Sequence, residues 1–170
     1  SRPNRHLEFG TWKGEGVIRV LEECDAHVWT INIWEGERDS DGRPVYFGGE
    51  SDIFESPSGS LQTDSKGAIG YKYLEANLGN RVDQIYSDSR NWDDLTYPDG
   101  FFDSVFVDGA HDAESVKSDL YRALRLLRPG GLLLMHDFVP DPVIHANCPS
   151  TVGVACAVAD ELEKLKEMCE

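Results

Sequence analysis

The 170-residue sequence has no long hydrophobic run, and it has few basic residues for its size. No apolar stretch approaches the ~20 residues that a membrane-spanning helix needs, and the amino terminus lacks the charged-then-apolar layout of a signal peptide. Lys and Arg total 16 against 31 Asp and Glu, for a formal net charge of -15. Nucleic acid and anionic membrane surfaces are bound through concentrated positive charge, so the sequence argues against both partners.

Cysteine is also sparse. The four cysteines are scattered, with no Cys-x-x-Cys pair and no histidine spacing that would close a zinc site. They are Cys24, Cys148, Cys156 and Cys169. Such cysteines are typical of reduced thiols, so we expect a cytoplasmic protein.

The length and the hydrophobic content of 40% predict a single domain over residues 1–170. Residues 37–65 differ from the rest, because Gly, Ser, Asp and Pro dominate them. Connections longer than ~12–15 residues are unusual in compact domains and tend to be lids, binding loops or disordered segments. We therefore expect a long excursion at 37–65 that contributes to a pocket or covers it.

Elsewhere the hydrophobic pattern alternates between strands and helices. Strands are predicted around residues 5–9, 27–34, 81–86, 101–107 and 132–135, and helices at 15–24, 66–78, 112–127 and 151–168. This order predicts an α/β fold, a doubly wound, mostly parallel sheet in three layers. The run Leu132–Met135 is apolar at every position, which favours a central place for its strand. A sharp turn at 128–131 and a Pro-rich bend at 139–149 are expected beside it.

A polar cluster follows each predicted strand, and in such sheets these ends form the ligand site. The clusters are Gly10–Gly14, Asn32–Glu35, Ser87–Ser89, Asp108–His111 and His136–Asp137. The first one, with glycines on either side of Trp12, suits a nucleotide-type pocket, but it also occurs in ordinary strand-to-helix turns. Likewise Asp108-Gly109 alone could be a turn, and His136 alone could be a core histidine.

Together these clusters resemble a class I S-adenosylmethionine-dependent methyltransferase, in particular the small-molecule O-methyltransferase group that includes macrolide-sugar O-methyltransferases. The resemblance is carried by Leu7-Glu-Phe-Gly-Thr-Trp-Lys-Gly14, by Ile31-Asn-Ile-Trp-Glu-Gly36, by Phe102-Asp-Ser-Val-Phe-Val-Asp-Gly-Ala-His-Asp-Ala-Glu-Ser-Val116 with the following Val-x-x-Asp-Leu pattern, and by Leu126-Leu-Arg-Pro-Gly-Gly-Leu-Leu-Leu-Met-His-Asp137. It implies a Rossmann-like fold that here lacks the last two strands, because the sequence stops in the last helix. The sheet would then have five strands, with its edge at the last strand or at a partner subunit. This open edge would be covered by a homo-oligomer or a neighbouring domain, or belong to a shortened chain.

The resemblance also implies how a cofactor would be held. Glu8, Gly10 and Gly14, with Thr11 between the glycines, would lie against the methionine part of S-adenosylmethionine. Asp88 would face the adenine amine, with Ser87 and Ser89 shaping that wall, and Asp108 would close the site. Asn32 stands where the family usually has an acid that binds the ribose hydroxyls, so one charge-assisted hydrogen bond is lost.

Methyl transfer to a hydroxyl requires the oxygen to lose its proton. His111 is the predicted general base, with Asp108 beside it, because an unperturbed imidazole pKa of about 6.5 suits proton removal near neutrality. In metal-dependent relatives, the carboxylates at the positions of Asp108 and Asp137 bind Mg²⁺, although a further oxygen ligand is not evident here.

The leading hypothesis is methyl transfer from S-adenosylmethionine to an oxygen of a small-molecule acceptor. Two alternatives stay open. One is a non-catalytic cofactor-binding or assembly module that keeps the methyltransferase fold, and the other is a hydrolase or hydroxylase-associated protein that uses Asp108 and Asp137 to hold a metal.

Overall fold

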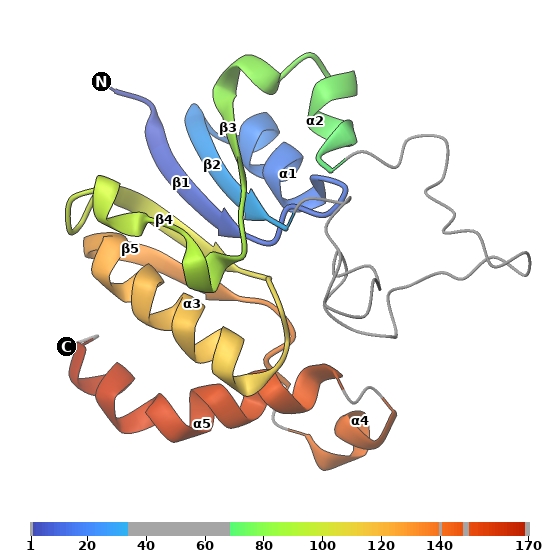
Figure 1. Cartoon of the computed structure of the whole chain (residues 1–170), viewed down its shortest axis with the longest axis vertical. Coiled ribbons are helices and arrows are strands. Elements are labelled where there is room, and N and C mark those ends of the chain that lie inside the picture. Colours follow the sequence, from blue (N-terminus) through green and yellow to red (C-terminus); the bar gives the residue numbers. More distant parts are fainter. Residues whose placement is uncertain (1, 34–68, 140, 148–149, 169–170) are drawn as a thin grey trace, which may run out of the picture.

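The computed structural model describes residues 2–33, 69–139, 141–147 and 150–168 (Figure 1). The predicted excursion at 37–65 lies outside these residues. Within them, no helix is long and apolar enough to cross a bilayer.

The core is a five-stranded, all-parallel sheet in the order β3-β2-β1-β4-β5 (Figure 1). The strands are β1 (Asn4–Phe9), β2 (Ala26–Asn32), β3 (Val82–Tyr86), β4 (Phe102–Val107) and β5 (Leu127–Met135). From β1 the chain first adds β2 and β3 on one side of the sheet, and then adds β4 and β5 on the other side of β1. The predicted doubly wound fold is therefore confirmed, with its switch point beside β1.

Helices cover both faces of the sheet, which gives the predicted three layers (Figure 1). On one face α1 (Glu15–Glu23) and α2 (Tyr71–Glu75) pack over Val28 of β2. On the other face α3 (Ala113–Leu126) packs over β1 and β4, and α5 (Ser150–Met168) packs against α3. Because β1 lies between the two layers, Leu7 and Phe9 are fully buried.

The central place predicted for the last strand from its apolar run is wrong, whereas the five-stranded sheet with an edge at the last strand, which the resemblance implies, is confirmed. Strand β5 pairs only with β4 and forms an edge of the described sheet. Leu133 and Met135 pack into the core under α3, whereas Leu132 and Leu134 remain 56% and 45% exposed. A run of apolar residues does not reveal whether a helix covers both of its faces, and α1 lies over β2 instead.

The predicted turn at 128–131 belongs to β5. The register jumps from Phe102 opposite Leu127 to Ser104 opposite Leu132, so residues 128–131 bulge opposite Asp103. The bulge brings the Arg128 Nε atom to 2.7 Å from an Asp103 carboxylate oxygen. This long-range ion pair explains why a Pro-Gly-Gly sequence stays attached to the strand.

Helix boundaries also differ from the expectation. Of the predicted helix 66–78 the structure describes residues 69–78. Within these, regular α2 covers only Tyr71–Glu75, because Gly70 before it and Asn77 after it have positive φ. The predicted bend at 139–149 contains a short helix, α4 (Pro142–Asn147). Three short 3-10 turns, η1 (Gly79–Arg81), η2 (Ser89–Asn91) and η3 (Asp94–Thr96), lie on either side of β3.

Candidate functional site

The loops that follow the strands lie in a row at the carboxyl edge of the sheet. Backbone hydrogen bonds continue the ladder past the strand ends, from Asp108 N to Phe9 O at 2.8 Å and from His136 N to Val107 O at 3.0 Å. On the other side, Gly10 N donates to Ile31 O at 2.9 Å. The described residues of the predicted clusters, which do not include 34 and 35, thus lie next to one another around the switch point.

Gly10 lies where the loops after β1 and β4 contact each other. Its φ of +92° is left-handed, and a Cβ atom at this position would lie 1.9 Å from the Asp108 carbonyl oxygen. Gly14 has a φ of +85°, and a Cβ atom on it would lie 2.8 Å from the Tyr73 ring. Both glycines are therefore required by contacts within the protein, and their predicted approach to a cofactor stays a prediction.

Glu8 is a buried carboxylate at the end of β1, with 2% exposure. It packs against Gly16 of α1, where a Cβ atom would lie 2.6 Å from Oε2, and Oε2 has no hydrogen-bond partner among the described residues. Burial, and secondarily Asp108, raises the pKa of Glu8 well above its ordinary value. The neighbouring His6 stays neutral, because burial lowers its pKa to about 4.

An orphaned buried acceptor requires an explanation, and a cationic ligand is one of the few groups that would satisfy it. Glu8 thus fits its predicted role beside the ammonium group of S-adenosylmethionine. Gly16 was not predicted as part of this site. The Gly14-x-Gly16 spacing at the start of α1 was the available signal.

The side chains of Asn32 and Thr11 fix the Gly10–Gly14 loop through hydrogen bonds. The Asn32 Oδ1 atom accepts from the backbone N–H groups of Thr11 and Trp12, at 2.9 and 3.2 Å. The buried Thr11 hydroxyl lies 2.7 Å from the Thr30 hydroxyl and accepts from Gln84 at 3.0 Å. The amide of Asn32 is therefore occupied by the loop, and its contact with a ribose stays a prediction.

Asp88 organises the segment after β3. Its carboxylate accepts from the backbone N–H of Arg90 at 2.9 Å and pairs with the Arg90 guanidinium at 2.6 Å. These hydrogen bonds hold the pKa of Asp88 below its ordinary value, so the group is ionised at neutral pH. Ser87 donates to the Asp88 carbonyl at 3.0 Å, and Ser89 opens η2. An ionised acceptor at this edge is compatible with the predicted adenine contact.

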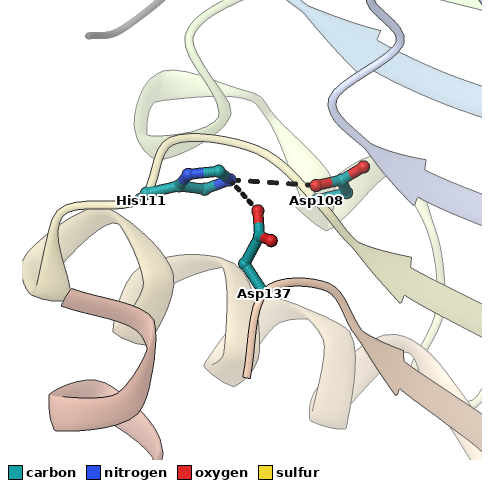
Figure 2. A group of neighbouring side chains, drawn as sticks. All are labelled: Asp108, His111 and Asp137. Atoms are coloured by element: carbon teal, nitrogen blue, oxygen red, sulfur yellow. Dashed lines mark ion pairs between the residues drawn. The ribbon is translucent and has the colours of Figure 1, made fainter. Parts of the chain in front are cut away.

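The predicted catalytic residues form one cluster at the ends of β4 and β5 (Figure 2). The His111 Nε2 atom lies 3.3 Å from Asp137 Oδ2 and 3.8 Å from Asp108 Oδ1. The His136 Nδ1 atom lies 3.0 and 3.2 Å from the same two oxygens. Two imidazoles thus flank two carboxylates, and Asp137 adopts a left-handed φ of +53°. His136 is 53% exposed at its side chain, so it is not a core histidine.

Donor atoms of Asp108, His111 and Asp137 all lie within 4.8 Å of one another, close enough to share a metal ion (Figure 2). Magnesium prefers an octahedron of oxygen ligands, and this group supplies two carboxylates and one imidazole. The donor set therefore fits an ion that accepts nitrogen, such as Zn²⁺ or Mn²⁺, better than Mg²⁺. Without a metal, the same carboxylates would stabilise a protonated His111.

Comparison with known proteins identifies the fold family. A family model described as a methyltransferase domain matches residues 7–138. No curated protein matches the sequence.

Solved structures share the fold. An O-methyltransferase from Bacillus cereus, solved with S-adenosylhomocysteine, is 20% identical with a TM-score of 0.56, covering 92% of this chain and 61% of that one. A methyltransferase from Geobacter sulfurreducens, also solved with S-adenosylhomocysteine, is 14% identical with a TM-score of 0.52, covering 99% of this chain and 58% of that one. The chain thus spans less than two thirds of either protein. The family match extends from β1 to the end of β5, and the chain belongs to the methyltransferase-domain family.

Proposed function

We propose that the protein transfers a methyl group from S-adenosylmethionine to an oxygen of a small-molecule acceptor. The observation that carries the proposal is the cluster of Asp108, His111 and Asp137 at the switch-point edge of a methyltransferase-family sheet. S-adenosylmethionine would supply an electrophilic methyl group. The remaining chemistry is to orient the acceptor and to remove its proton.

In this proposal the cofactor is held by the residues around the switch point. The buried Glu8 carboxylate receives the ammonium group, and Gly10, Thr11 and Gly14 shape the loop beside it. Asn32 faces the ribose, and Ser87, Asp88 and Ser89 face the adenine. Asp108 closes the site from the β4 side.

His111 is the proposed general base for the acceptor hydroxyl. After proton uptake at one ring nitrogen, the imidazolium would be stabilised by Asp137, 3.3 Å away, and by Asp108, 3.8 Å away. If Asp108 and Asp137 instead bind Mg²⁺, or bind another divalent ion together with His111, the ion would lower the pKa of the acceptor hydroxyl. Metal content of the purified protein, before and after EDTA, distinguishes these two forms of the site.

Calorimetric titration with S-adenosylmethionine and S-adenosylhomocysteine tests the cofactor. We expect both to bind, and we expect Asp88→Ala to weaken both at least ~10-fold because a charge-assisted hydrogen bond is lost. Asp93→Ala, which removes a nearby exposed carboxylate, is the matched control and should bind as wild type does. No heat and no thermal shift with either ligand would contradict the proposal.

A non-catalytic cofactor-binding module is the second candidate, and one observation favours it. The Asn32 amide, in the place of the family's acid, is engaged with the loop amides of Thr11 and Trp12. Cofactor binding without methyl transfer to any of a panel of hydroxyl acceptors, macrolide sugars included, would favour this candidate. Acceptor-dependent formation of S-adenosylhomocysteine would exclude it.

A further inference from the structure

Asp119 is a buried carboxylate that the proposed function leaves without a role. It lies in α3 within the Val-x-x-Asp-Leu pattern and is fully buried, with 0% exposure. Neither of its oxygens has a hydrogen-bond partner among the described residues. A buried, unpartnered carboxylate is unusual and costly in a folded protein, which makes Asp119 a candidate for a functional role.

The cations near Asp119 are committed elsewhere. The Arg122 guanidinium donates to Asp94 Oδ1 and to the carbonyl oxygens of Trp92 and Arg90. Arg90 pairs with Asp88. Burial raises the pKa of Asp119 to about 7, and the carboxylates of Asp88 and Asp112 add to this, while Ser89 and Arg122 oppose it.

Asp119 lies between two walls of the candidate site. On one side, its Oδ2 atom is 2.9 Å from the position that a Cβ atom on Gly109 would occupy, so the carboxylate touches the loop that carries Asp108 and His111. On the other side α3 contacts η2, which begins at Ser89. The Ser89 side chain is close enough to lower the pKa of Asp119, although neither carboxylate oxygen has a partner in hydrogen-bonding geometry among the described residues.

Unused donors lie beside these unused acceptors. Backbone hydrogen bonds within the described ranges include none from the N–H groups of Gly109 and Ala110. Gly109 is also the residue against which the carboxylate packs. A movement of this loop would therefore bring N–H groups that make no backbone hydrogen bond among the described residues against the Asp119 carboxylate.

We propose that Asp119 is a positioning residue that joins the Ser87–Ser89 wall to the Asp108–His111 loop when an adenosyl ligand fills the cleft. In the bound state its carboxylate accepts from the Ser89 hydroxyl and from the loop amides at Gly109 and Ala110. This inference rests on the proposed function, because it assumes that an S-adenosyl ligand occupies this edge of the sheet.

The test compares stability with affinity in Asp119→Asn, which keeps the shape and removes the charge. Because Asn carries no charge, the variant avoids the desolvation cost that raises the Asp119 pKa, and it should melt at the same temperature as wild type or higher. Because charge-assisted hydrogen bonds of the bound state are lost, its Kd for S-adenosylhomocysteine should rise ~10-fold or more. Glu114→Gln, an exposed position on the same helix, is the control and should change neither quantity.

A double-mutant cycle with Ser89→Ala locates the effect. If Asp119 acts through the Ser89 hydroxyl, the losses of affinity in the two single variants will not add in the double variant. A merely structural Asp119 would give an Asp119→Asn variant that is less stable than wild type, and this result overturns the proposal. Wild-type affinity in Asp119→Asn overturns it as well. Failure of the wild-type protein to bind any S-adenosyl ligand is a different result, which removes the proposed function and this inference together.

Discussion

At the scale of single residues, two glycines with the same backbone conformation have different surroundings. Gly10 and Gly130 both have positive φ, +92° and +70°. At Gly10 a Cβ atom would lie 1.9 Å from the Asp108 carbonyl oxygen, whereas at Gly130 the nearest atom is the end of the Arg128 side chain, at 4.0 Å. The two positions therefore separate the backbone cost of positive φ from the cost of a steric clash.

We expect Gly10→Ala to lower the free energy of unfolding by about 3 kcal/mol or more, because the loops after β1 and β4 must move apart. Gly130→Ala, the matched control, should cost only about 1 kcal/mol, the usual penalty for a left-handed alanine. Urea unfolding of both variants measures the difference. Equal losses would show that the loops separate easily and that their contact does not constrain the site.

At the scale of elements, α2 and β3 hold the Gly10–Gly14 loop in place through a partly buried chain of polar side chains. The Tyr73 hydroxyl donates to Gln84 Oε1 at 2.8 Å, and the Gln84 amide donates to Thr11 Oγ1 at 3.0 Å. Backbone bonds reinforce it, from Gly70 N to the Trp12 carbonyl at 2.7 Å. The Gly10–Gly14 loop thus depends on α2 and β3, which lie more than 50 residues away in the sequence, because Tyr73 and Gln84 must both be in place.

Replacing Tyr73 with Phe tests this connection. Burial raises the pKa of Tyr73 to about 12, so the hydroxyl keeps its proton and acts as a donor. Its loss leaves the Gln84 oxygen unpaired and should lower the free energy of unfolding by about 1–2 kcal/mol. Tyr86→Phe, on an exposed side chain of β3, should stay within about 0.5 kcal/mol of wild type. Faster amide exchange at Thr11 in Tyr73→Phe alone would place the effect at the loop, and identical exchange in both variants would contradict it.

What the sequence could predict follows the same distinction between local and distant contacts. Strand and helix periodicity is local, so the five strands and the row of polar loops at their carboxyl ends were predictable. The edge position of β5 depends on where helices cover the sheet, and the side-chain pattern of Leu132–Met135 does not record that. Three other features depend on contacts between residues distant in sequence, so periodicity could not predict them. They are the hydrogen bond from the Thr11 N–H to Asn32, the close approach of Gly10 to Asp108, and the lack of a hydrogen-bond partner for Asp119 among the described residues.

At the scale of the whole molecule, charged side chains cluster at both edges of the sheet. The acids of the candidate site, Asp108 and Asp137 among them, lie at the carboxyl edge in a chain of net charge -15. At the amino edge, three arginines contact the carboxylate of Asp103. The Asp103 carboxylate pairs with Arg2 and with Arg128, both at 2.7 Å, and accepts from the Arg5 backbone N–H at 2.9 Å. Asp103 therefore ties β1, β4 and β5 together away from the site.

Asp103 should for this reason control the acid stability of the whole domain. Its pKa is held below the ordinary value of 3.8, first by the hydrogen bond from Arg2 and then by Arg5 and Arg128. A carboxyl whose pKa is depressed by folding contributes stability above its unfolded pKa, and this contribution is lost as the pH falls through the folded pKa.

Asp103→Asn should therefore lose about 2–3 kcal/mol at pH 7 and show a shallower further loss below pH 4 than wild type. Arg2→Ala is the comparison, and because the Arg2 side chain is 52% exposed it should cost clearly less stability than Asp103→Asn, which loses all three arginine contacts. Urea unfolding at pH 7, 4 and 3 measures both variants, and parallel acid limbs in Asp103→Asn and wild type would show that the three strand ends are held together by other contacts.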